Sequence, residues 1–141
     1  MSYDTTNVFA KILRGEMPCH KVYEDADTLG FMDIMPRGEG HTLVIPKTPA
    51  RNVLDASPEQ LAACMRTVQI IARAVMTAFG ATGVTIQQFN EPAGGQVVFH
   101  LHYHVIPRYD GVGLQPHSGK IADGQLIAAN AEKLEAALAG R

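Results

Sequence analysis

The sequence lacks long hydrophobic runs and a surplus of basic residues, and each absence argues against a class of protein. No run of about 18 apolar residues occurs, so we expect no membrane span and no membrane partner. The first seven residues are polar, without the basic start and apolar core of a signal peptide, which favours a cytoplasmic location. With a formal net charge of -2, no concentrated positive surface is expected for nucleic acid.

Cysteine is also scarce, and tryptophan is absent. The two cysteines, Cys19 and Cys64, are expected to be reduced thiols rather than a disulfide framework. The length of 141 residues suits one domain with one hydrophobic core. Hydrophobic residues make up 46% of the chain and charged residues 18%, which is typical of a globular protein and argues against disorder.

Helical and extended patterns alternate along the chain. Apolar residues at helical spacing predict helices at about 7–14, 57–79 and 123–139. The second is the longest, and Ser57-Pro58-Glu59-Gln60 gives it a capping box with proline at the first helical position. Apolar and β-branched runs predict strands at 21–24, 28–33, 41–45, 84–89 and 97–106, and an irregular loop follows at 108–120. This order predicts an α+β domain with a mainly antiparallel sheet.

Three of the six histidines lie in one window, His100-Leu101-His102-Tyr103-His104. Successive side chains of a strand point to opposite faces, so the three imidazoles share one face and the intervening apolar residues share the other. Neighbouring histidines are then separated by roughly 7 Å, at a rise of about 3.3 Å per residue. We expect the apolar face to be buried and the histidines to line the opposite side.

Three interpretations of this row remain open from the residues alone: a polar face in contact with solvent, a metal site, or a catalytic site. A single ion is disfavoured, because the outer histidines lie roughly 13 Å apart on the strand spacing while zinc–nitrogen bonds measure about 2 Å. The window also contains no carboxylate or thiolate. We therefore predict no metal and no cofactor.

Catalysis suits the chemistry of imidazole. Histidine titrates near neutral pH, so one ring can attack as a neutral base while a neighbour steadies anionic oxygens. Phosphate esters fit this arrangement, because charge develops on the phosphoryl oxygens in the transition state. Gly94-Gly95-Gln96 precedes the row, and it supports this hypothesis because glycines let backbone N–H groups approach an anion and Gln96 adds an amide donor.

The window resembles the signature of the histidine triad (HIT) family, His-φ-His-φ-His-φ-φ with φ apolar, here His100 to Ile106. The resemblance covers roughly residues 7 to 109 and is closest to bacterial proteins of the Hint type. Matching blocks follow the family order at residues 9–12, 15–18, 22–25, 31–34, 40–47, 90–91 and 95–96. The resemblance implies one HIT-like domain over residues 1–141, with its core at 7–109 and a C-terminal loop and helix at 110–141.

The resemblance also implies catalytic roles. The middle histidine, His102, would attack the α-phosphorus of a nucleotide and form a covalent nucleotidyl-histidine intermediate that water releases. His100 would orient the nucleophile through its backbone carbonyl, and His104 would contact phosphate. His41 would extend the hydrogen-bond chain beside the triad, and Gln96 would act near the leaving group. Taken alone, His41 also fits a structural role at the start of a strand.

Further residues match the nucleotide-binding positions of the family. By this resemblance, Asp33 holds the ribose hydroxyls and Ile34 lies against the purine, whereas from the residues alone Asp33 also fits a turn at a strand end. Asn90, Gly95 and Gln96 match contacts to the phosphate or the leaving group, together with His104.

Two departures from the family pattern bear on these expectations. Many relatives bind zinc through a Cys-x-x-Cys pair and a histidine, with a triad histidine, but here Asn7, Ala10 and Pro49 occupy those positions. Structural zinc is therefore not expected. Val97 stands where Hint proteins usually have serine, a possible proton donor to a departing amine. The tail after Arg108 also lacks the tryptophan-containing ending that helps set leaving-group choice in Hint enzymes.

The leading hypothesis is an enzyme that hydrolyses a purine nucleotide at its α-phosphate. Candidate substrates are an adenosine phosphoramidate, an acyl adenylate and a dinucleoside polyphosphate, and the resemblance implies a homodimer. The main alternative is a regulatory module that binds nucleotides with little turnover. A metal-dependent hydrolase is the third hypothesis, and chelation would abolish its activity.

Overall fold

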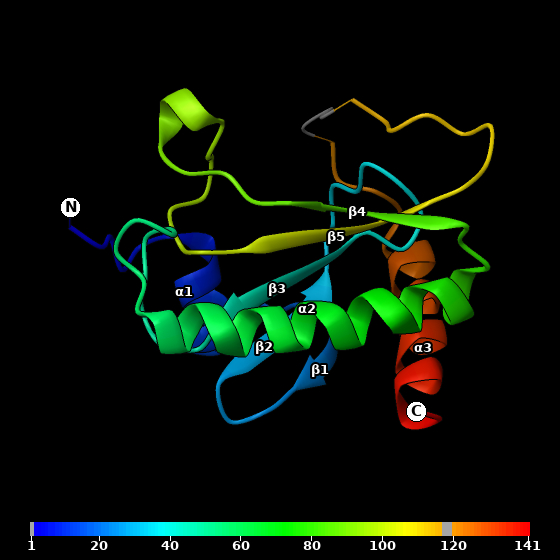
Figure 1. The fold of residues 1–141 in the computed structure, drawn as a ribbon, viewed down its shortest axis with the longest axis horizontal. Helices are drawn as coiled ribbons and strands as arrows, with labels where there is room; N and C mark the ends of the chain where they lie inside the picture. The colour runs from blue at the N-terminus through cyan, green and yellow to red at the C-terminus, as the bar shows by residue number, and fades with distance from the viewer. Residues whose placement is uncertain (1, 117–119) are drawn as a thin grey trace.

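The computed structural model describes residues 2–116 and 120–141, and within them five strands form one antiparallel sheet with the order β1-β2-β3-β5-β4 (Figure 1). The strands are β1 (Lys21–Glu24), β2 (Thr28–Met32), β3 (Thr42–Pro46), β4 (Gly83–Gln87) and β5 (Tyr103–Arg108). The helices are α1 (Val8–Leu13), α2 (Pro58–Phe79) and α3 (Gly124–Ala139), with a 3₁₀ turn, η1 (Pro92–Gly94). The predicted α+β architecture is confirmed: an antiparallel sheet, one long central helix and shorter helices near each end.

Local sequence signals determine where the helices begin and end. The Asn7 side chain accepts a hydrogen bond from the Ala10 amide at 2.9 Å and caps α1. Ser57 and Gln60 form the predicted capping box at the start of α2. The helix ends at Gly80, whose φ of 64° is accessible to glycine without steric cost.

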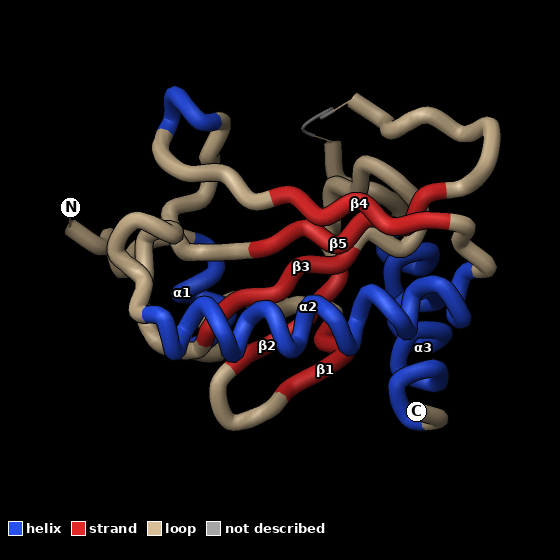
Figure 2. Tube along the Cα trace, in the orientation of Figure 1, coloured by secondary structure: helices blue, strands red, loops and turns tan. Residues whose placement is uncertain are grey.

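The main hydrophobic core lies between the sheet and α2, which crosses one face of the sheet (Figure 2). Ile71 of α2 is fully buried, and a Cβ atom at Gly30 of β2 would lie 2.7 Å from its Cδ1 atom. Glycine at this position therefore lets the helix pack closely on the strand. Helix α3 packs against α2 and β1 and completes this core with Ile127, Ala131, Leu134 and Leu138.

Helix α2 is long and apolar enough to pass a composition test for a membrane span, and it is the one such helix among the described residues. Its buried residues, however, pack against the sheet and α3. This placement is that of a core helix.

The opposite face of the sheet carries a smaller apolar cluster beside α1. Its buried members are Phe9, Leu29, Phe31, Leu43 and Ile45. Alternation along the strands explains the division, because Met32 and Val44 belong to the main core while Phe31 and Leu43 belong to this cluster. The two faces thus differ in the amount of apolar surface that they bury.

One predicted strand is wrong in its first half. The pattern predicts a strand over 97–106, but β5 begins at Tyr103 and residues 97–102 form no strand. Among the described residues, this segment has no partner strand in the sheet. The pairing of β4 with β5 stops at Gln87, opposite His104, and residues 90–95 then form the loop that contains η1. The alternation nevertheless persists, since Leu101, Tyr103 and Val105 all lie in the main core.

The predicted irregular loop at 108–120 contains no helix or strand beyond Arg108 in its described part, and residues 117–119 lie outside the described residues. The Gln115 amide donates to the Arg37 carbonyl at 2.8 Å, and the Ala122 amide donates to the Ile34 carbonyl at 2.8 Å. These bonds attach the segment before α3 to the loop that follows β2.

Candidate active site

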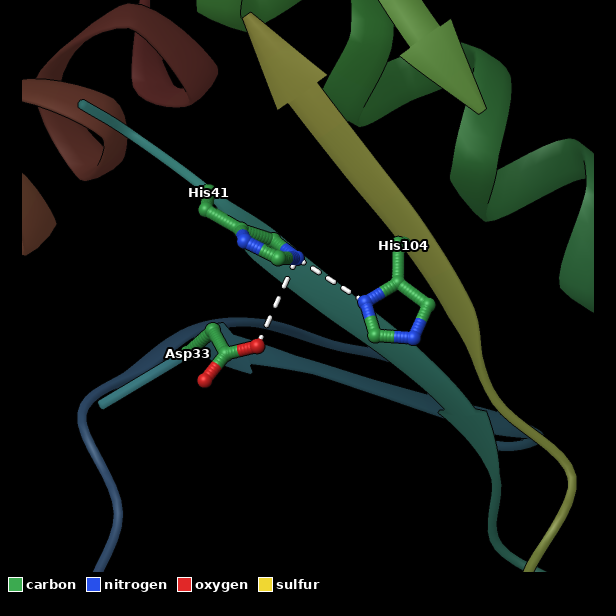
Figure 3. A group of neighbouring side chains, drawn as sticks. All are labelled: Asp33, His41 and His104. Atoms are coloured by element: carbon green, nitrogen blue, oxygen red, sulfur yellow. Dashed lines mark hydrogen bonds and ion pairs between the residues drawn. The ribbon is translucent and has the colours of Figure 1, made fainter. Parts of the chain in front are cut away.

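Neighbouring strands bring Asp33, His41 and His104 together. Asp33 follows β2, His41 precedes β3, and His104 lies in β5, the next strand in the sheet. The Asp33 amide donates to the His41 carbonyl at 3.0 Å, and Leu43 pairs with His104 across β3 and β5. The three side chains consequently meet on one side of the sheet (Figure 3).

The hydrogen-bond partners of His41 determine which of its ring nitrogens carries the proton. The backbone amide of Arg37 donates to Nδ1 of His41 at 3.0 Å, so the proton of a neutral ring lies on Nε2. Nε2 lies 2.9 Å from Nδ1 of His104 and 3.4 Å from a carboxylate oxygen of Asp33 (Figure 3). His41 therefore donates towards His104, and a neutral His104 carries its own proton on Nε2, where it can donate to an anion.

His102 has the complementary arrangement. Its Nδ1 atom lies 2.7 Å from the backbone carbonyl oxygen of His100, which can only accept, so Nδ1 is the donor. The lone pair of the neutral ring then lies on Nε2. The side chain is buried, and burial lowers the pKa of His102 below its usual value, which keeps the ring neutral near pH 7. Nε2 of His102 thus has the electronic form of a nucleophile or base.

The ring of His102 contacts the rings of both Phe9 and His104. The ring centroids of His102 and His104 are 5.1 Å apart, and those of Phe9 and His102 are 4.9 Å apart. Phe9 belongs to the cluster on the α1 face, so these two histidines lie on the side of the sheet opposite the main core. A potential nucleophile and a potential donor therefore stand side by side.

His100 makes a separate set of contacts. It is 1% exposed, and its Nε2 atom donates to the Pro46 carbonyl at 2.9 Å. Burial lowers the pKa of His100 to about 4, so the ring is neutral at pH 7. The Tyr3 hydroxyl is hydrogen-bonded to its Nδ1 atom, and no local sequence signal could predict this contact between residues 97 positions apart.

The predicted donor Gln96 is buried and occupied by contacts within the chain. Its Oε1 atom accepts from the Asn52 side chain at 3.0 Å and from the Glu91 amide at 2.8 Å. Its Nε2 atom donates to the carbonyl oxygens of Arg51 and Val98. In this structure Gln96 positions the loop before the triad, and a direct contact with substrate remains a prediction.

The same loop carries the predicted residues Asn90 and Gly95. Asn90 accepts from the Val53 amide at 2.9 Å and exchanges hydrogen bonds with Gln88. Gly95 is exposed and has a φ of 94°, a conformation suited to glycine. Between them, Glu91 has a positive φ of 66°, which is costly for a residue with a side chain.

Arg51 and Asn52 hold Glu91 in this conformation. The Arg51 guanidinium makes two contacts with the Glu91 carboxylate, at 2.7 and 3.0 Å, and Asn52 donates to the same carboxylate at 2.6 Å. Arg51 also lies over the ring of Phe99, 4.2 Å from its centroid. Sequence reasoning missed these two residues, because only the folded chain brings them to a loop some forty residues away.

Asp33 and Ile34, the predicted nucleoside contacts, lie at the edge of the histidine group. The Asp33 side chain is 15% exposed, and one of its oxygens accepts from the Met35 amide at 2.8 Å. Ile34 is 41% exposed, so part of its apolar surface is accessible. The pair offers an acceptor and an apolar surface to a ligand.

The spacing of Asp33, His41 and His104 would also fit a metal ion, since one ligand atom from each lies within 4.8 Å of the others. The partner of His41 argues against this use. A histidine that binds metal through one nitrogen normally donates an N–H from the other, but Nδ1 of His41 faces the N–H donor of Arg37. The Nε2 proton of His41 instead lies between two acceptors, Nδ1 of His104 at 2.9 Å and the Asp33 carboxylate at 3.4 Å.

Two of the positions that bind zinc in many relatives hold Asn7 and Ala10 in this chain, and neither is a thiolate or an imidazole. Asn7 caps α1, and its Nδ2 atom donates to the Tyr3 hydroxyl at 3.0 Å, while Ala10 is buried. These donors and carbon atoms do not fit zinc, which prefers thiolate and imidazole ligands.

Comparisons with known proteins identify the family and the fold. Residues 14–111 match the model of the HIT domain. A crystal structure of a Hit-like protein from Bartonella henselae superposes with a TM-score of 0.92 at 50% identity, covering 97% of this chain and 99% of that chain. An adenylylsulfatase of Arabidopsis thaliana is 42% identical over 72% of this chain and 51% of its own length. An adenosine 5'-monophosphoramidase of Schizosaccharomyces pombe is 37% identical over 72% of this chain and 73% of its own length.

Proposed function

Since the chain belongs to the HIT family of nucleotide hydrolases, we propose that it cleaves purine nucleotides at the α-phosphate through a covalent intermediate on His102. One observation carries the proposal. The His100 carbonyl accepts a hydrogen bond from Nδ1 of buried His102, so the lone pair of the neutral ring lies on Nε2, beside the ring of His104. A neutral nucleophile next to an oriented donor is what attack on an anionic phosphoryl group requires.

In the first step, Nε2 of His102 forms a bond to the α-phosphorus as the bond to the leaving group breaks. The leaving group departs with that electron pair and takes a proton from solvent. His104, polarised by His41, donates from Nε2 to a non-bridging phosphoryl oxygen. Water then attacks the phosphorus and gives a proton to solvent, the P–N bond breaks with its electron pair returning to Nε2 of His102, and AMP is released from the neutral ring.

Asp33 and Ile34 supply the nucleoside contacts in this proposal. The Asp33 carboxylate lies beside His41 and can accept from the ribose hydroxyls, and exposed Ile34 offers an apolar surface to the base. The backbone around Gly95, with Asn90 and Gln96 behind it, would then face the phosphate or leaving group.

Two relatives suggest where to look for substrates. One is named an adenylylsulfatase and the other an adenosine 5'-monophosphoramidase, and both names describe hydrolysis at an adenylyl group. Adenylyl sulfate and adenosine phosphoramidates are therefore the first substrates to test, followed by acyl adenylates and dinucleoside polyphosphates.

The decisive experiment is to incubate the chain with an adenosine phosphoramidate, measure AMP release and quench early for mass spectrometry. We expect AMP, together with an adenylyl adduct on the peptide that contains His102. Chelators should leave the rate unchanged, because no step uses a metal. Nucleotide binding without AMP or adduct would refute the proposal and favour the regulatory module, and loss of activity on chelation would favour a metal-dependent hydrolase.

We also propose that the chain forms a homodimer through α2 and the edge strand β4. Met65 and Met76 of α2 are 47% and 37% exposed, and Ile86 of β4 is 41% exposed. Within residues 2–116 and 120–141, strand β4 pairs with β5 alone, which leaves its other edge for a second chain. Light scattering should give twice the chain mass at micromolar concentration, and a monomer would refute this.

We also propose a cytoplasmic location, which suits the free thiols Cys19 and Cys64.

A further inference from the structure

The segment before α1 reaches the first histidine of the triad. The Tyr3 hydroxyl is hydrogen-bonded to Nδ1 of His100, and the two rings meet edge to face with centroids 5.6 Å apart. Asn7 donates to the same hydroxyl at 3.0 Å. Because Asn7 also caps α1 by accepting from the Ala10 amide, this contact is fixed to the start of the helix.

The direction of each hydrogen bond follows from its acceptors. The Pro46 carbonyl can only accept, so Nε2 of His100 carries the proton and Nδ1 carries the lone pair. The Tyr3 hydroxyl must then donate to Nδ1 while it accepts from Asn7. Burial supports this assignment, because it lowers the pKa of His100 to about 4 and raises the pKa of Tyr3, so both groups are neutral at pH 7.

Both ring nitrogens of His100 and its backbone carbonyl therefore take part in hydrogen bonds, and the carbonyl is the group that orients His102. Tyr3 fixes one ring nitrogen, Pro46 fixes the other, and the backbone carbonyl accepts from His102 at 2.7 Å. Residues 97–102 lie outside the sheet, so no strand ladder fixes this carbonyl. The Leu101 amide, which shares a planar peptide unit with the His100 carbonyl, donates to the Ala50 carbonyl at 2.8 Å and holds this unit from one side. The two bonds of the His100 ring hold the same residue through its side chain.

We propose that Tyr3 is a positioning residue, whose hydroxyl fixes the ring of His100 and, through the His100 carbonyl, the orientation of the nucleophile His102. This inference rests on the function proposed above and adds a residue outside the HIT-domain match, which begins at residue 14. Tyr3 acts through His100, so it should affect the rate of the chemical step more than the binding of substrate.

Tyr3→Phe removes the hydroxyl and keeps the ring. We expect kcat for AMP release to fall about fivefold to tenfold, as for the loss of one oriented hydrogen bond, with little change in KM. Tyr23→Phe is the matched control, since Tyr23 lies on β1, outside the site, and its hydroxyl donates to Asp25; the kcat of this variant should stay at the wild-type value. A wild-type kcat in Tyr3→Phe, or an equal fall in both variants, would overturn the proposal.

Imidazole ¹⁵N spectra test the same contact without turnover. We expect wild-type His100 to be protonated on Nε2, and Tyr3→Phe to shift the Nδ1 signals of His100 and His102 but not those of His41. If the wild-type chain released no AMP from any conjugate, the proposed function would fail. The His102 shift in Tyr3→Phe would then decide the positioning role alone, and its absence would overturn it.

Discussion

The two faces of the sheet differ in what they bury. The face under α2 and α3 carries an apolar core that runs from Val22 on β1 to Leu138 on α3. The face beside α1 has a much smaller apolar cluster, and it shares its burial with His41, His100 and His102. Burying imidazoles costs free energy unless each polar atom is bonded, and here backbone carbonyls, an amide and a tyrosine supply those bonds.

This contrast teaches how one small sheet supports both stability and chemistry. On one face, packing of mainly apolar side chains stabilises the fold. On the other face the hydrogen bonds that satisfy buried histidines also fix their tautomers, so one ring presents a lone pair and another a proton. Substitutions on the two faces should therefore affect different measurements.

The largest expected effect comes from the histidine face. His102→Asn keeps a donor that can reach the His100 carbonyl but removes the nitrogen that attacks. We expect AMP release to fall at least about a thousandfold, while the free energy of unfolding stays within about 1 kcal/mol. Steady-state kinetics and urea denaturation measure the two quantities. His20→Asn, outside the site, should retain activity, and equal losses in both variants would contradict the division.

Truncation on the other face should give the reverse pattern. Ile71→Ala removes a fully buried side chain above Gly30, and we expect a loss of about 2–5 kcal/mol in the free energy of unfolding. The folded fraction should keep a normal kcat at low temperature. Gln69→Ala, exposed on the same helix, should change stability by less than about 0.5 kcal/mol. A drop in kcat of folded Ile71→Ala would show that the faces are coupled.

Acid should lower the free energy of unfolding through the buried ring of His100. The pKa of His100 is about 4 in the folded chain against an ordinary value of 6.5, so between these values the unfolded chain binds a proton that the folded chain excludes. Stability is then complete above pH 6.5 and falls as the pH drops towards 4, by about 2 kcal/mol between pH 7 and pH 5. Urea denaturation at both pH values measures this, and His100→Asn should show a smaller difference. Equal stability of the wild type at pH 5 and pH 7 would contradict it.

The smallest effect is expected at Val97, which is 73% exposed next to the loop of Gly95 and Gln96. Val97→Ser introduces a hydroxyl that could protonate a departing amine. We expect a few-fold rise in kcat with phosphoramidates, no rise with a sulfate leaving group, and unchanged stability because the side chain is exposed. Comparing kcat for the two substrate types tests this, and equal gains with both would show that the hydroxyl does not act on the amine.

Much of the fold was predictable because its signals are local. The capping residues Asn7 and Ser57, the turn after Lys21–Glu24 and the apolar stripe of α2 each depend on neighbours within a few positions. The strand over 97–106 was predicted too long, because its first half has the composition of a strand but no partner to pair with. Pairing is a property of two segments, and one segment does not encode it alone.

The sequence by itself determined that the triad histidines would lie on the face opposite the main core, since Leu101, Tyr103 and Val105 alternate with them and carry the apolar surface of that core. Only the tertiary structure decided which nitrogen of each ring bears the proton. That choice depends on the Arg37 amide, the carbonyls of Pro46 and His100, and the hydroxyl of Tyr3. Pro46 and Tyr3 lie 54 and 97 positions from His100, whereas the Arg37 amide lies four positions from His41 and the His100 carbonyl two positions from His102. Hydrogen bonding is directional, so even the near groups act only once the chain has folded.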